Sequence, residues 1–373
     1  ADVWVDALFG IGLSRAPEGR AAALIEALNA SGAPCFSLDV PSGVDADTGH
    51  VPGVAVRAEL TLGFLLPLFG LHTGAACNHV GERLLDRLGV KPASADDPAP
   101  VARLLGPADL RHWFPPRRRD SHKGSHGRVL CVGGDHGYGG AIRLCGEAAL
   151  RAGAGLVGVA TRDTHVAALL AARPELMVRG LDAPDALAPM IEGAGVLALG
   201  PGLGRGAWGR ALFEAGLAAG RPTVLDADAL ALLAEAPVAL PSGSVLTPHP
   251  GEAARLLGCD TATVQADRLQ AVRAIAQAHG AVVVLKGAGT LVAEPGGEVR
   301  LIGAGNPGLA SGGTGDVLTG VIAARLAEGM DAFGAACAGA LLHACAGDSA
   351  AAEGERGMLA SDLFPWLRRL ANP

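Results

Sequence analysis

Short apolar runs alternate with longer segments whose apolar residues recur at helical spacing, and this alternation extends over most of the chain. Most of the runs end in loops rich in glycine or polar residues. Strand, loop and helix in this order form the repeating unit of a parallel α/β sheet. Helices are predicted at 18–30, up to about residue 151, at 164–172 and at 317–326. Buried strands are predicted at 3–8, 35–40, 128–132, 156–161, near 178, and at 196–199, 223–225, 245–246 and 281–285.

The alternation is interrupted once, between residues 91 and 107. This stretch reads K-P-A-S-A-D-D-P-A-P-V-A-R-L-L-G-P, carries four prolines and shows no sustained periodicity. Such a change of composition is typical of a linker. We therefore predict a first domain at 1–90, a linker at 91–107 and a second domain at 108–373.

Composition narrows the class of protein. Of the 373 residues half are apolar, only 3% are aromatic, and the net charge is −7. An acidic balance argues against nucleic acid as the main partner. The basic triplet Arg117–Arg119 is interpreted as a solvated loop. The weakly charged run 332–347 contains His343 and is too short to span a bilayer, so a buried helix is predicted and no membrane partner.

The cysteines are scattered singly and none forms a C-x-x-C pair. We interpret them as small core residues of a protein in a reducing cytoplasm, and find no signal peptide. The apolar content is also compatible with a homo-oligomer.

Loops of distinctive composition follow five of the predicted strands. They read G-G-D-H-G-Y-G-G, G-P-G-L-G, L-D-A-D-A, T-P-H-P-G-E and K-G-A-G-T, in chain order. The carboxyl ends of parallel strands meet at one edge of a sheet, so these loops should converge on one cleft. We predict that this cleft binds a nucleotide and a substrate.

The stretch 303–320, G-A-G-N-P-G-L-A-S-G-G-T-G-D-V-L-T-G, is expected at the same cleft. Glycines free backbone N–H groups to face a ligand, and a helix start adds partial positive charge, so the stretch suits phosphate. Its one acid, Asp316, has two interpretations from the residues alone. It could cap the following helix, or it could act as a base toward a hydroxyl beside a bound phosphate.

Lysine is rare here: the chain has only Lys91, Lys123 and Lys286 among its 30 basic residues. Lys286 ends a buried strand, where an ammonium group is costly unless it meets an anion. We therefore favour a phosphate or nucleotide contact for Lys286. For Lys123 a phosphate contact and a solvated surface position stay equally open.

Several polar residues in the other loops have open roles. His249 is favoured as a substrate contact over a satisfied turn histidine, and Glu252 is a candidate helix cap. Asp226 and Asp228 are candidates to hold magnesium through waters or to cap the next helix. Capping is favoured for Asp228, and the choice stays open for Asp226. No Walker loop, Rossmann fingerprint or G-x-S-x-G elbow supports a P-loop enzyme, a dehydrogenase or a serine hydrolase.

The amino-terminal motifs carry a resemblance. D-A-L-F-G-I-G-L, followed after a helix by L-D-V-P-S-G-V-D-A-D-T-G, resembles the latter half of the NAD(P)H-hydrate epimerase domain. The resemblance implies a truncated Rossmann-like α/β domain with K⁺ held by Asp6 and Ser42. From the residues alone, Ser42 could equally be a capping hydroxyl and Asp39 a turn-forming acid. The implied substrate and catalytic positions are Gly10, Ile11, Gly12, Leu13, Ser14, Arg15, Ala16 and Asp39.

This first domain departs from that family in two ways. The early asparagine- and glycine-rich loop that completes the epimerase site has no counterpart in the sequence, and Leu68 stands where the family usually has lysine. We therefore expect a partial, inactive epimerase here. With the missing part present, epimerase activity would be expected.

The second domain carries a more extensive resemblance. G-G-T-G-D at 312–316 resembles the anion hole of ribokinase-like enzymes, which implies a parallel three-layer α/β sandwich. This motif occurs in order with the five loops described above and with H-K-G-S-H-G-R-V-L-C-V-G-G. Together these motifs resemble ADP-dependent NAD(P)H-hydrate dehydratase over nearly all of 108–373. The resemblance implies that ADP is the phosphoryl donor and Mg²⁺ a cofactor. It also implies (S)-NAD(P)H hydrate as the substrate, and NAD(P)H, AMP and phosphate as the products.

The dehydratase resemblance also implies residue roles. Asp316 is the catalytic base, and the anion hole is formed by Gly312, Gly313, Thr314 and Gly315. The nucleotide-binding positions are Lys286, Gly287, Ala288, Gly289, Thr290 and Gly315. The hydrate-binding positions are Ala141, Gly202, His249 and Asp316. The alternatives are a ribokinase-like kinase of a small alcohol and a non-catalytic nicotinamide-nucleotide sensor.

Overall fold

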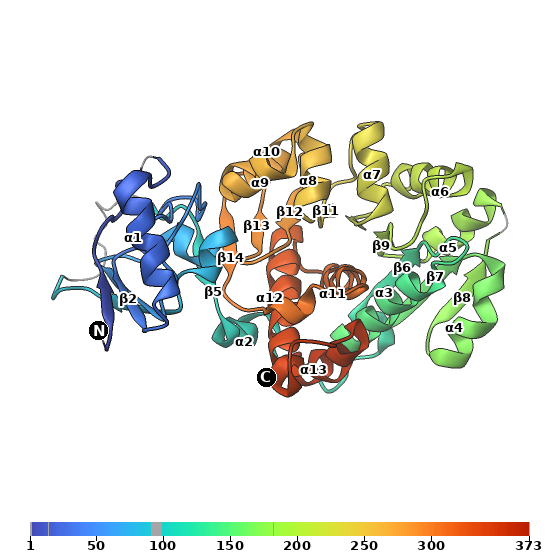
Figure 1. The fold of residues 1–373 in the computed structure, drawn as a ribbon. Coiled ribbons are helices and arrows are strands. Elements are labelled where there is room, and N and C mark those ends of the chain that lie inside the picture. The colour runs from blue at the N-terminus through green and yellow to red at the C-terminus, as the bar shows by residue number, and fades with distance from the viewer. Residues whose placement is uncertain (1, 14, 91–98, 182, 373) are drawn as a thin grey trace. The chain divides into compact units, whose positions relative to one another are not determined.

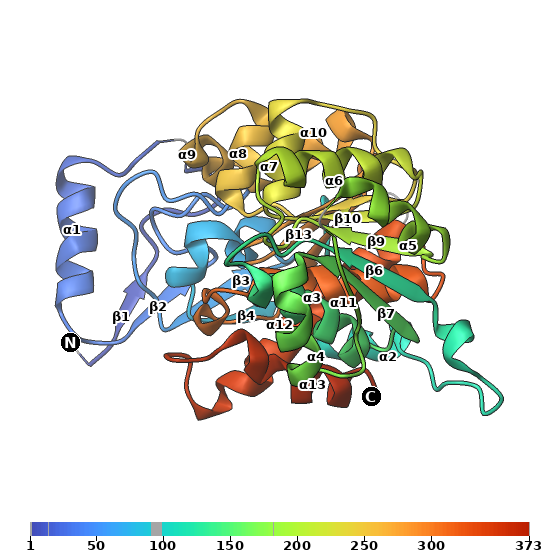
Figure 2. The same ribbon diagram turned by 90° about the vertical axis from the view of Figure 1, so that its right-hand side faces the viewer.

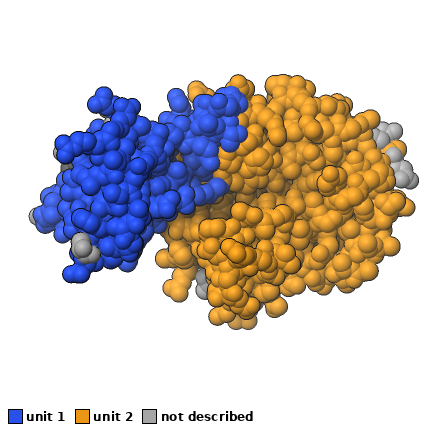
Figure 3. Space-filling model, in the orientation of Figure 1, with its two compact units in different colours: residues 1–103, 259–271, 287–289 blue, residues 104–258, 272–286, 290–373 orange. Residues whose placement is uncertain are grey.

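The structure, a computed structural model, describes residues 2–13, 15–90, 99–181 and 183–372. It contains two compact units, shown in different colours in Figure 3. Unit 1 comprises residues 1–103, 259–271 and 287–289, and unit 2 comprises 104–258, 272–286 and 290–373. Part of the predicted linker, residues 91–98, lies outside the described residues, as does Ser14.

Unit 1, which includes the blue amino-terminal part of the ribbon in Figure 1, contains a four-stranded, wholly parallel sheet in the order β1-β2-β3-β4. Figure 2 labels the four strands. The amphipathic segment predicted at 18–30 forms a helix, and the apolar run at 35–40 forms a shorter strand than predicted. The elements are β1 Trp4–Asp6, α1 Gly19–Ala30, β2 Cys35–Leu38, β3 Leu60–Phe64 and β4 Glu82–Asp86, with α9 Thr261–Ala266 from later in the chain.

One face of this sheet keeps apolar side chains exposed. The register pairs Val5 with Phe36 and Leu62 with both Leu38 and Leu84, so these side chains share one face. Val5 is 60% exposed and Leu84 46%. The opposite face contributes buried groups such as Ser37. An apolar sheet face left open to this extent is unusual for a monomeric domain.

Unit 2 is built on a ten-stranded sheet in the order β5-β14-β13-β12-β11-β10-β9-β6-β7-β8. The seven strands from β6 to β12 are parallel to one another, as predicted. The bounds are β5 Arg103–Leu105, β6 Arg128–Val132, β7 Leu156–Thr161, β8 Met177–Gly180, β9 Val196–Leu199, β10 Thr223–Leu225, β11 Val245–Leu246, β12 Val282–Leu285, β13 Leu291–Ala293 and β14 Val299–Ile302.

The sequence did not predict the strands that extend this sheet at one side. β13 pairs antiparallel with both β12 and β14, so the sheet is mixed rather than wholly parallel. The two strands form a hairpin around 294–298, which reads E-P-G-G-E. Each has only three or four residues, too few to show the alternation of a half-buried strand.

Helices cover both faces of the sheet of unit 2. In Figure 2 α6, α7 and α8 lie on one side, and α3, α11, α12 and α13 lie on the other, which gives the predicted three layers. The bounds are α2 Leu110–Trp113, α3 Gly139–Ala152, α4 Val166–Ala172, α5 Ala188–Glu192, α6 Ala207–Ala218, α7 Asp228–Glu235, α8 Pro250–Leu257, α10 Arg268–His279, α11 Thr314–Ala327, α12 Ala332–Ala350 and α13 Leu363–Leu370.

Helices α11 and α12 form the centre of one layer and are buried on nearly all sides. Glycines let them approach their neighbours closely. A Cβ atom at Gly320 would lie 2.0 Å from the Cys145 carbonyl oxygen of α3, and one at Gly339 would lie 2.6 Å from Ile322. In a chain poor in aromatics, such close helix contacts fill the interior. The buried helix predicted at 332–347 is confirmed as part of α12.

The cysteine prediction is only partly confirmed. Cys35, Cys131, Cys145, Cys337 and Cys345 are buried, whereas Cys77 is partly buried and Cys259 is exposed. Cys259 lies between Gly258, the C-cap of α8, and Asp260, the N-cap of α9, so its apolar neighbours on one side were a poor guide to its burial. Among the described residues, no helix has the length and apolar character needed to cross a membrane.

We predict that Gly320→Ala destabilises unit 2 by about 1–3 kcal/mol, because the added methyl group forces α3 and α11 apart. Gly140→Ala in α3 is the control, since a Cβ there meets no atom within 4 Å. It should be neutral or slightly stabilising because alanine favours a helix over glycine. Denaturant unfolding measures both. Equal unfolding midpoints for the two variants would contradict the close packing of α3 against α11.

Candidate active site

The loops that follow the parallel strands of unit 2 are joined to one another at one edge of the sheet. Gly134 N donates to Pro201 O at 3.0 Å, which joins the loops after β6 and β9. A Cβ atom at Gly200 would lie 1.9 Å from the Asp226 carbonyl oxygen, so the loops after β9 and β10 are in contact. Lys286 N donates to Pro248 O at 2.9 Å. The predicted convergence of the five loops is confirmed.

The amino end of α11 lies at the same edge. Its N-cap is Gly313, whose φ of 94° is a left-handed conformation that favours glycine. A Cβ there would also lie 2.6 Å from Leu144 of α3, whereas one at Gly312 would meet open space. The Thr314 hydroxyl donates to the Leu309 and Ser311 carbonyl oxygens at 2.8 and 2.9 Å. The first N–H groups of a helix have no partner within it, so this end can face an anion.

Asp316 does not occupy the N-cap position of α11, so the capping role that the residues alone left open is excluded. Asp316 is the third residue of α11, and Gly313 occupies the N-cap position without a side-chain cap. The helix begins earlier than the apolar run at 317–326 indicated, because Thr314 and Gly315 are already helical. The Asp316 carboxylate therefore lies within the first turn of α11 and is not the N-cap acceptor of that helix.

Two residues of α12 hold the glycine-rich stretch in place. Asp348 accepts hydrogen bonds from Gly305 N and from Asn306 Nδ2, both at 2.9 Å. His343 Nε2 lies 2.9 Å from Thr314 O, and a carbonyl oxygen requires the nitrogen to donate. Burial lowers the pKa of His343 to about 4, so the ring is neutral at physiological pH. Neither side chain could be assigned to the site from the sequence, because nothing local to α12 marks them.

Below the first turn of α11 lies a buried ion pair. Lys286 Nζ is 2.8 Å from Asp226 Oδ1, and Asp226 Oδ2 accepts from the Thr319 hydroxyl at 2.9 Å. Glu252 Oε2 lies 3.9 Å from the same ammonium group. A Cβ at Gly315 would be 3.3 Å from Lys286 Nζ. The lysine thus meets carboxylates as well as the helix end, and Asp226 is a partner of the lysine rather than a helix cap.

The charges of this pair act on each other and on Asp316. Burial opposes the ammonium of Lys286, but Asp226 and Glu252 outweigh burial, so the pKa of Lys286 is raised. Burial also opposes the carboxylate of Asp226, yet Lys286 lowers its pKa. Burial, with the charge of Asp226, raises the pKa of Asp316 to about 7, although Lys286 opposes the shift. Asp316 is therefore poised near neutrality, where a general base is most effective.

His249 and Glu252 cap α8 reciprocally. His249 Nδ1 accepts from Gly251 N at 3.0 Å and from Glu252 N at 3.3 Å, and Glu252 Oε2 accepts from His249 N at 2.8 Å. The predicted capping role of Glu252 is confirmed, although α8 begins at Pro250 rather than at Glu252. The His249 side chain is 53% exposed. Its predicted substrate contact stays a prediction.

The two small residues predicted to bind the hydrate lie together. Gly202 has a φ of 59°, and a Cβ there would lie 2.6 Å from Tyr138 Cβ and 3.3 Å from Ala141 Cβ. Asp228 is the first residue of α7, and its Oδ2 accepts from Gly204 N at 2.9 Å. It therefore anchors the G-P-G-L-G loop, and the predicted role as N-cap is wrong because Ala227 occupies that position.

The predicted nucleotide-binding loop is divided between the two units. Lys286 and Thr290 belong to unit 2, and Gly287, Ala288 and Gly289 belong to unit 1. Within unit 1, Gly74 N donates to Ala288 O at 3.0 Å, and the Thr73 hydroxyl donates to Gly289 O at 3.0 Å. The nucleotide contacts of these residues and of Gly315 stay predictions.

Lys123 does not join this site. It precedes β6 and is exposed, so it lies at the opposite edge of the sheet from the loops that follow the strands. The solvated surface position left open by the sequence is the one observed.

In unit 1 the structure brings together the two residues predicted to hold K⁺. Asp6 is buried, and its carboxylate accepts from the Ser42 hydroxyl at 2.6 Å, from Ser42 N at 2.8 Å and from the Ser37 hydroxyl at 2.9 Å. Phe9 O lies 3.3 Å from Ser42 Oγ. These oxygens are the ligand type that K⁺ prefers, but a cation there would replace the Asp6–Ser42 hydrogen bond.

The predicted epimerase loop faces Asp39. A Cβ at Gly10 would lie 3.7 Å from Asp39 Oδ2, which places the two motifs side by side. Asp39 has a φ of 67°, an uncommon conformation that aspartate tolerates better than most residues. Such backbone strain is typical of functional sites. Of the predicted loop residues, Ser14 lies outside the described residues.

The donor set fits magnesium only together with a phosphate ligand. Among the described residues, no group of three or more His, Cys, Asp or Glu side chains could hold a metal ion. Asp226, Asp228 and Glu252 lie near the end of α11 but already accept protein hydrogen bonds. Mg²⁺ commonly retains waters and is held by one or two carboxylates and substrate phosphates, which this arrangement allows.

The raised pKa of Asp316 predicts a pH-dependent stability. The folded protein keeps this proton up to about pH 7, whereas an unfolded aspartate loses it near pH 4, so stability falls as the pH rises between these values. Asp316→Asn removes the effect. The unfolding free energy of Asp316→Asn relative to the wild type should be about 2–3 kcal/mol larger at pH 8 than at pH 5.

Denaturant unfolding at both pH values measures this gain, with Asp331→Asn as the control because Asp331 caps α12 outside the site. A gain from Asp316→Asn that is the same at pH 5 and pH 8 would contradict the raised pKa.

Comparison with known proteins bears on both parts of the chain. A family model described as NAD(P)H-hydrate dehydratase matches residues 129–369, and one described as YjeF-related protein N-terminus matches residues 1–70. The bifunctional NAD(P)H-hydrate repair enzyme Nnr of Escherichia coli (strain K12) is 48% identical over all of this chain and 72% of its own length. The enzyme of the same name from Coxiella burnetii is 47% identical, over 76% of its length.

Solved structures match unit 2. The ADP/ATP-dependent NAD(P)H-hydrate dehydratase from Bacillus subtilis, co-crystallized with ATP/Mg²⁺, is 31% identical with a TM-score of 0.66, over 72% of this chain and 97% of that chain. A ribokinase-like superfamily protein from Enterococcus faecalis is 30% identical with a TM-score of 0.68, over 75% of this chain and 100% of that chain. The predicted ribokinase-like fold is confirmed. With both family models matched and close identity over its whole length, the chain belongs to the family of bifunctional NAD(P)H-hydrate repair enzymes.

Proposed function

We propose that this chain dehydrates (S)-NAD(P)H hydrate with ADP, and that Asp316 is the general base. The observation that carries the proposal is the position of Asp316 in the first turn of α11, with a pKa raised to about 7. The names of its relatives describe the same repair reaction. Hydroxide leaves a carbon atom poorly, so the hydroxyl group of the hydrate must first become a better leaving group.

The proposed reaction has two steps. In the first, Asp316 takes the proton of the hydrate hydroxyl group while its oxygen attacks the β-phosphorus of ADP, and the bond between the β-phosphorus and the bridging oxygen breaks to release AMP. In the second, the carbon–oxygen bond breaks to release phosphate, the neighbouring carbon loses a proton to water, and the ring double bond of NAD(P)H forms. The sum is hydrate plus ADP giving NAD(P)H, AMP and phosphate.

The chain's own groups would stabilise the transferring phosphoryl group. The backbone N–H groups at 312–315 would donate to its oxygens, and the start of α11 adds partial positive charge. Lys286, held by Asp226 beside Gly315, would face the phosphates of the nucleotide. Mg²⁺ bound with ADP would neutralise phosphate charge, held through waters by Asp226, Asp228 or Glu252.

The small residues after β6 and β9 would accept the nicotinamide ring. Ala141 and Gly202 lie together, and the exposed Tyr138 lies beside them. His249 projects its exposed ring from the start of α8. We propose that the hydrate lies between these residues and Asp316.

We predict that Asp316→Asn nearly abolishes turnover while ADP still binds, because asparagine keeps the shape of the side chain but accepts no proton. The measurement mixes protein, NADH hydrate, Mg²⁺ and ADP, and follows reduced-nicotinamide absorbance together with AMP. Asp331→Asn is the matched control and should keep full activity.

Full activity of Asp316→Asn would refute the general-base role. A stable phosphorylated product made from ATP would instead indicate a kinase of a small alcohol. Tight binding of the hydrate without consumption of ADP would indicate a nicotinamide-nucleotide sensor.

For unit 1 we propose an epimerase-like site, with Asp6 and Ser42 as K⁺ ligands and Asp39 facing the loop at 10–16. We expect that residues 1–373 alone do not interconvert the R and S hydrates. Leu68 in place of the family's usual lysine supports this expectation. Chromatography of the two hydrates, incubated with this chain and K⁺, tests it. Dehydration of the S hydrate by the same preparation shows that the protein is folded. Interconversion of the epimers would overturn the expectation.

A further inference from the structure

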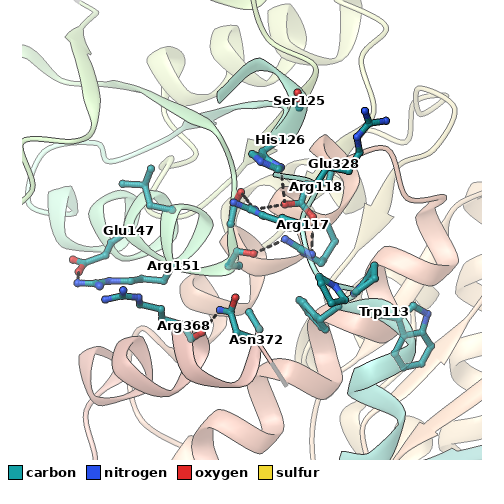
Figure 4. A pocket seen from close by; sticks show the side chains of 18 of the residues that line it. Trp113, Arg117, Arg118, Ser125, His126, Glu147, Arg151, Glu328, Arg368 and Asn372 are labelled. Carbon is teal, nitrogen blue, oxygen red and sulfur yellow. Dashed lines mark hydrogen bonds and ion pairs between the residues drawn. The ribbon is translucent and has the colours of Figure 1, made fainter. Parts of the chain in front are cut away.

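A cavity lies at the edge of unit 2 opposite the Asp316 site. Its volume is about 910 Å³. Its walls include Ser125 and His126, which precede β6, and Arg173 and Glu175, which precede β8. The carboxyl ends of α3, α11 and α13 supply much of the remainder (Figure 4). We refer to it as the amino-edge cavity, because it lies where these parallel strands begin.

The lining of the amino-edge cavity is strongly basic. Its arginines are Arg117, Arg118, Arg151, Arg173, Arg325 and Arg368, and its carboxylates are Glu147, Glu175 and Glu328. Guanidinium groups therefore outnumber carboxylates two to one, in a chain whose net charge is −7. A concentration of one sign of charge in a concave site attracts ligands of the opposite sign.

Part of this charge serves the fold. Arg117 donates to Gly153 O at 2.5 Å and Arg325 donates to Ala152 O, so both satisfy carbonyl groups at the end of α3. Both also pair with Glu328, at 2.6 and 2.7 Å. These two arginines and Glu328 form a support for the cavity wall.

The rest of the charge is only partly neutralised: Arg118 pairs with Asp120 at 2.7 Å, and Arg173 lies 3.8 Å from Glu175. Glu147 is buried, and Arg143 and Arg173 already contact it directly, whereas Arg151 lies 3.6 Å away. One carboxylate thus faces three guanidinium groups. Nε of Arg173 and Nε of Arg325 are buried and have no hydrogen-bond acceptor among the described residues. Arg325 is itself only 4% exposed.

Two arginines offer donors to the cavity from different helices. Arg151 is in the last turn of α3 and Arg368 in the last turn of α13, and Figure 4 shows both on the wall opposite Trp113. Within the described part of the chain, Arg368 has no carboxylate at ion-pair distance. Planar guanidinium groups match phosphate oxygens two at a time, which makes arginine the preferred residue for such anions.

We propose that the amino-edge cavity binds a phosphate-bearing small anion of nucleotide size, with Arg151 and Arg368 as its principal contacts. The volume lies within the range of about 300–1,000 Å³ that small-molecule sites occupy. Trp113 and Phe114 supply apolar wall beside the arginines, as a nucleoside would require. The site is separate from the Asp316 site, because the two lie at opposite edges of one sheet, and it does not depend on the proposed reaction.

The test is isothermal titration of the 373-residue chain with inorganic pyrophosphate. The variant Arg151→Ala/Arg368→Ala removes two guanidinium groups that are exposed or partly exposed, so it should fold. Arg221→Ala, an exposed arginine outside the cavity, is the matched control. We expect the wild-type chain and the control to bind pyrophosphate, and the double variant to lose one binding event or to bind it at least tenfold more weakly. Equal binding by the double variant and the wild type would overturn the proposal, as would no binding by the wild type.

A parallel titration with ADP distinguishes a nucleotide from a free phosphate compound. We expect the wild type to bind one more ADP than the double variant, with the remaining event at the Asp316 site unchanged. ADP binding that is identical in the two proteins, while pyrophosphate binding differs, would contradict the nucleotide-sized ligand. Loss of pyrophosphate binding in Arg221→Ala to the same extent would show a general effect of charge and overturn the site.

Discussion

The buried ion pair between Lys286 and Asp226 is the interaction on which the site depends. Two charges removed from water are stable only with close partners, and here each has them: Asp226 also accepts from Thr319, and Lys286 lies near Glu252. The pair holds a positive charge beside Gly315 and a negative charge near Asp316. One carboxylate can therefore be ionised while its neighbour, Asp316, stays poised near neutrality.

The fold explains why these groups meet. Asp226 follows β10, Lys286 follows β12, and Asp316 lies in the first turn of α11, which packs against β10. Parallel strands bring their carboxyl ends to one edge, so residues 90 positions apart become neighbours. The close packing of α3 against α11, which Gly320 permits, then sets the direction of the first turn. The residue that permits close packing, Gly320, and the proposed base, Asp316, thus lie in the same helix, α11.

The local pattern of apolar residues predicted those helices and strands that show a clear periodicity or are followed by a distinctive loop. The run R-V-L-C-V and its glycine loop predicted β6 with its bounds, and the five loops predicted the cleft. Residues whose role depends on distant partners were missed. His343 contacts Thr314 from another helix, and Asp348 contacts Asn306 across 42 positions. The antiparallel hairpin β13–β14 was missed because its strands are too short to show a period, and the start of α11 was placed too late because the helix begins before its apolar run.

The central claim is that burial, together with the negative charge of Asp226, raises the pKa of the base Asp316. It is tested most directly by the pH dependence of NADH recovery from the S hydrate with ADP. In the wild type the rate should rise with pH through an apparent pKa near 7, because the base must be ionised. Asp226→Asn removes a negative charge beside Asp316, and Asp226 no longer opposes the positive charge of Lys286. The residual activity of this variant should therefore rise with pH through a lower apparent pKa than in the wild type. An apparent pKa unchanged by Asp226→Asn would contradict the account.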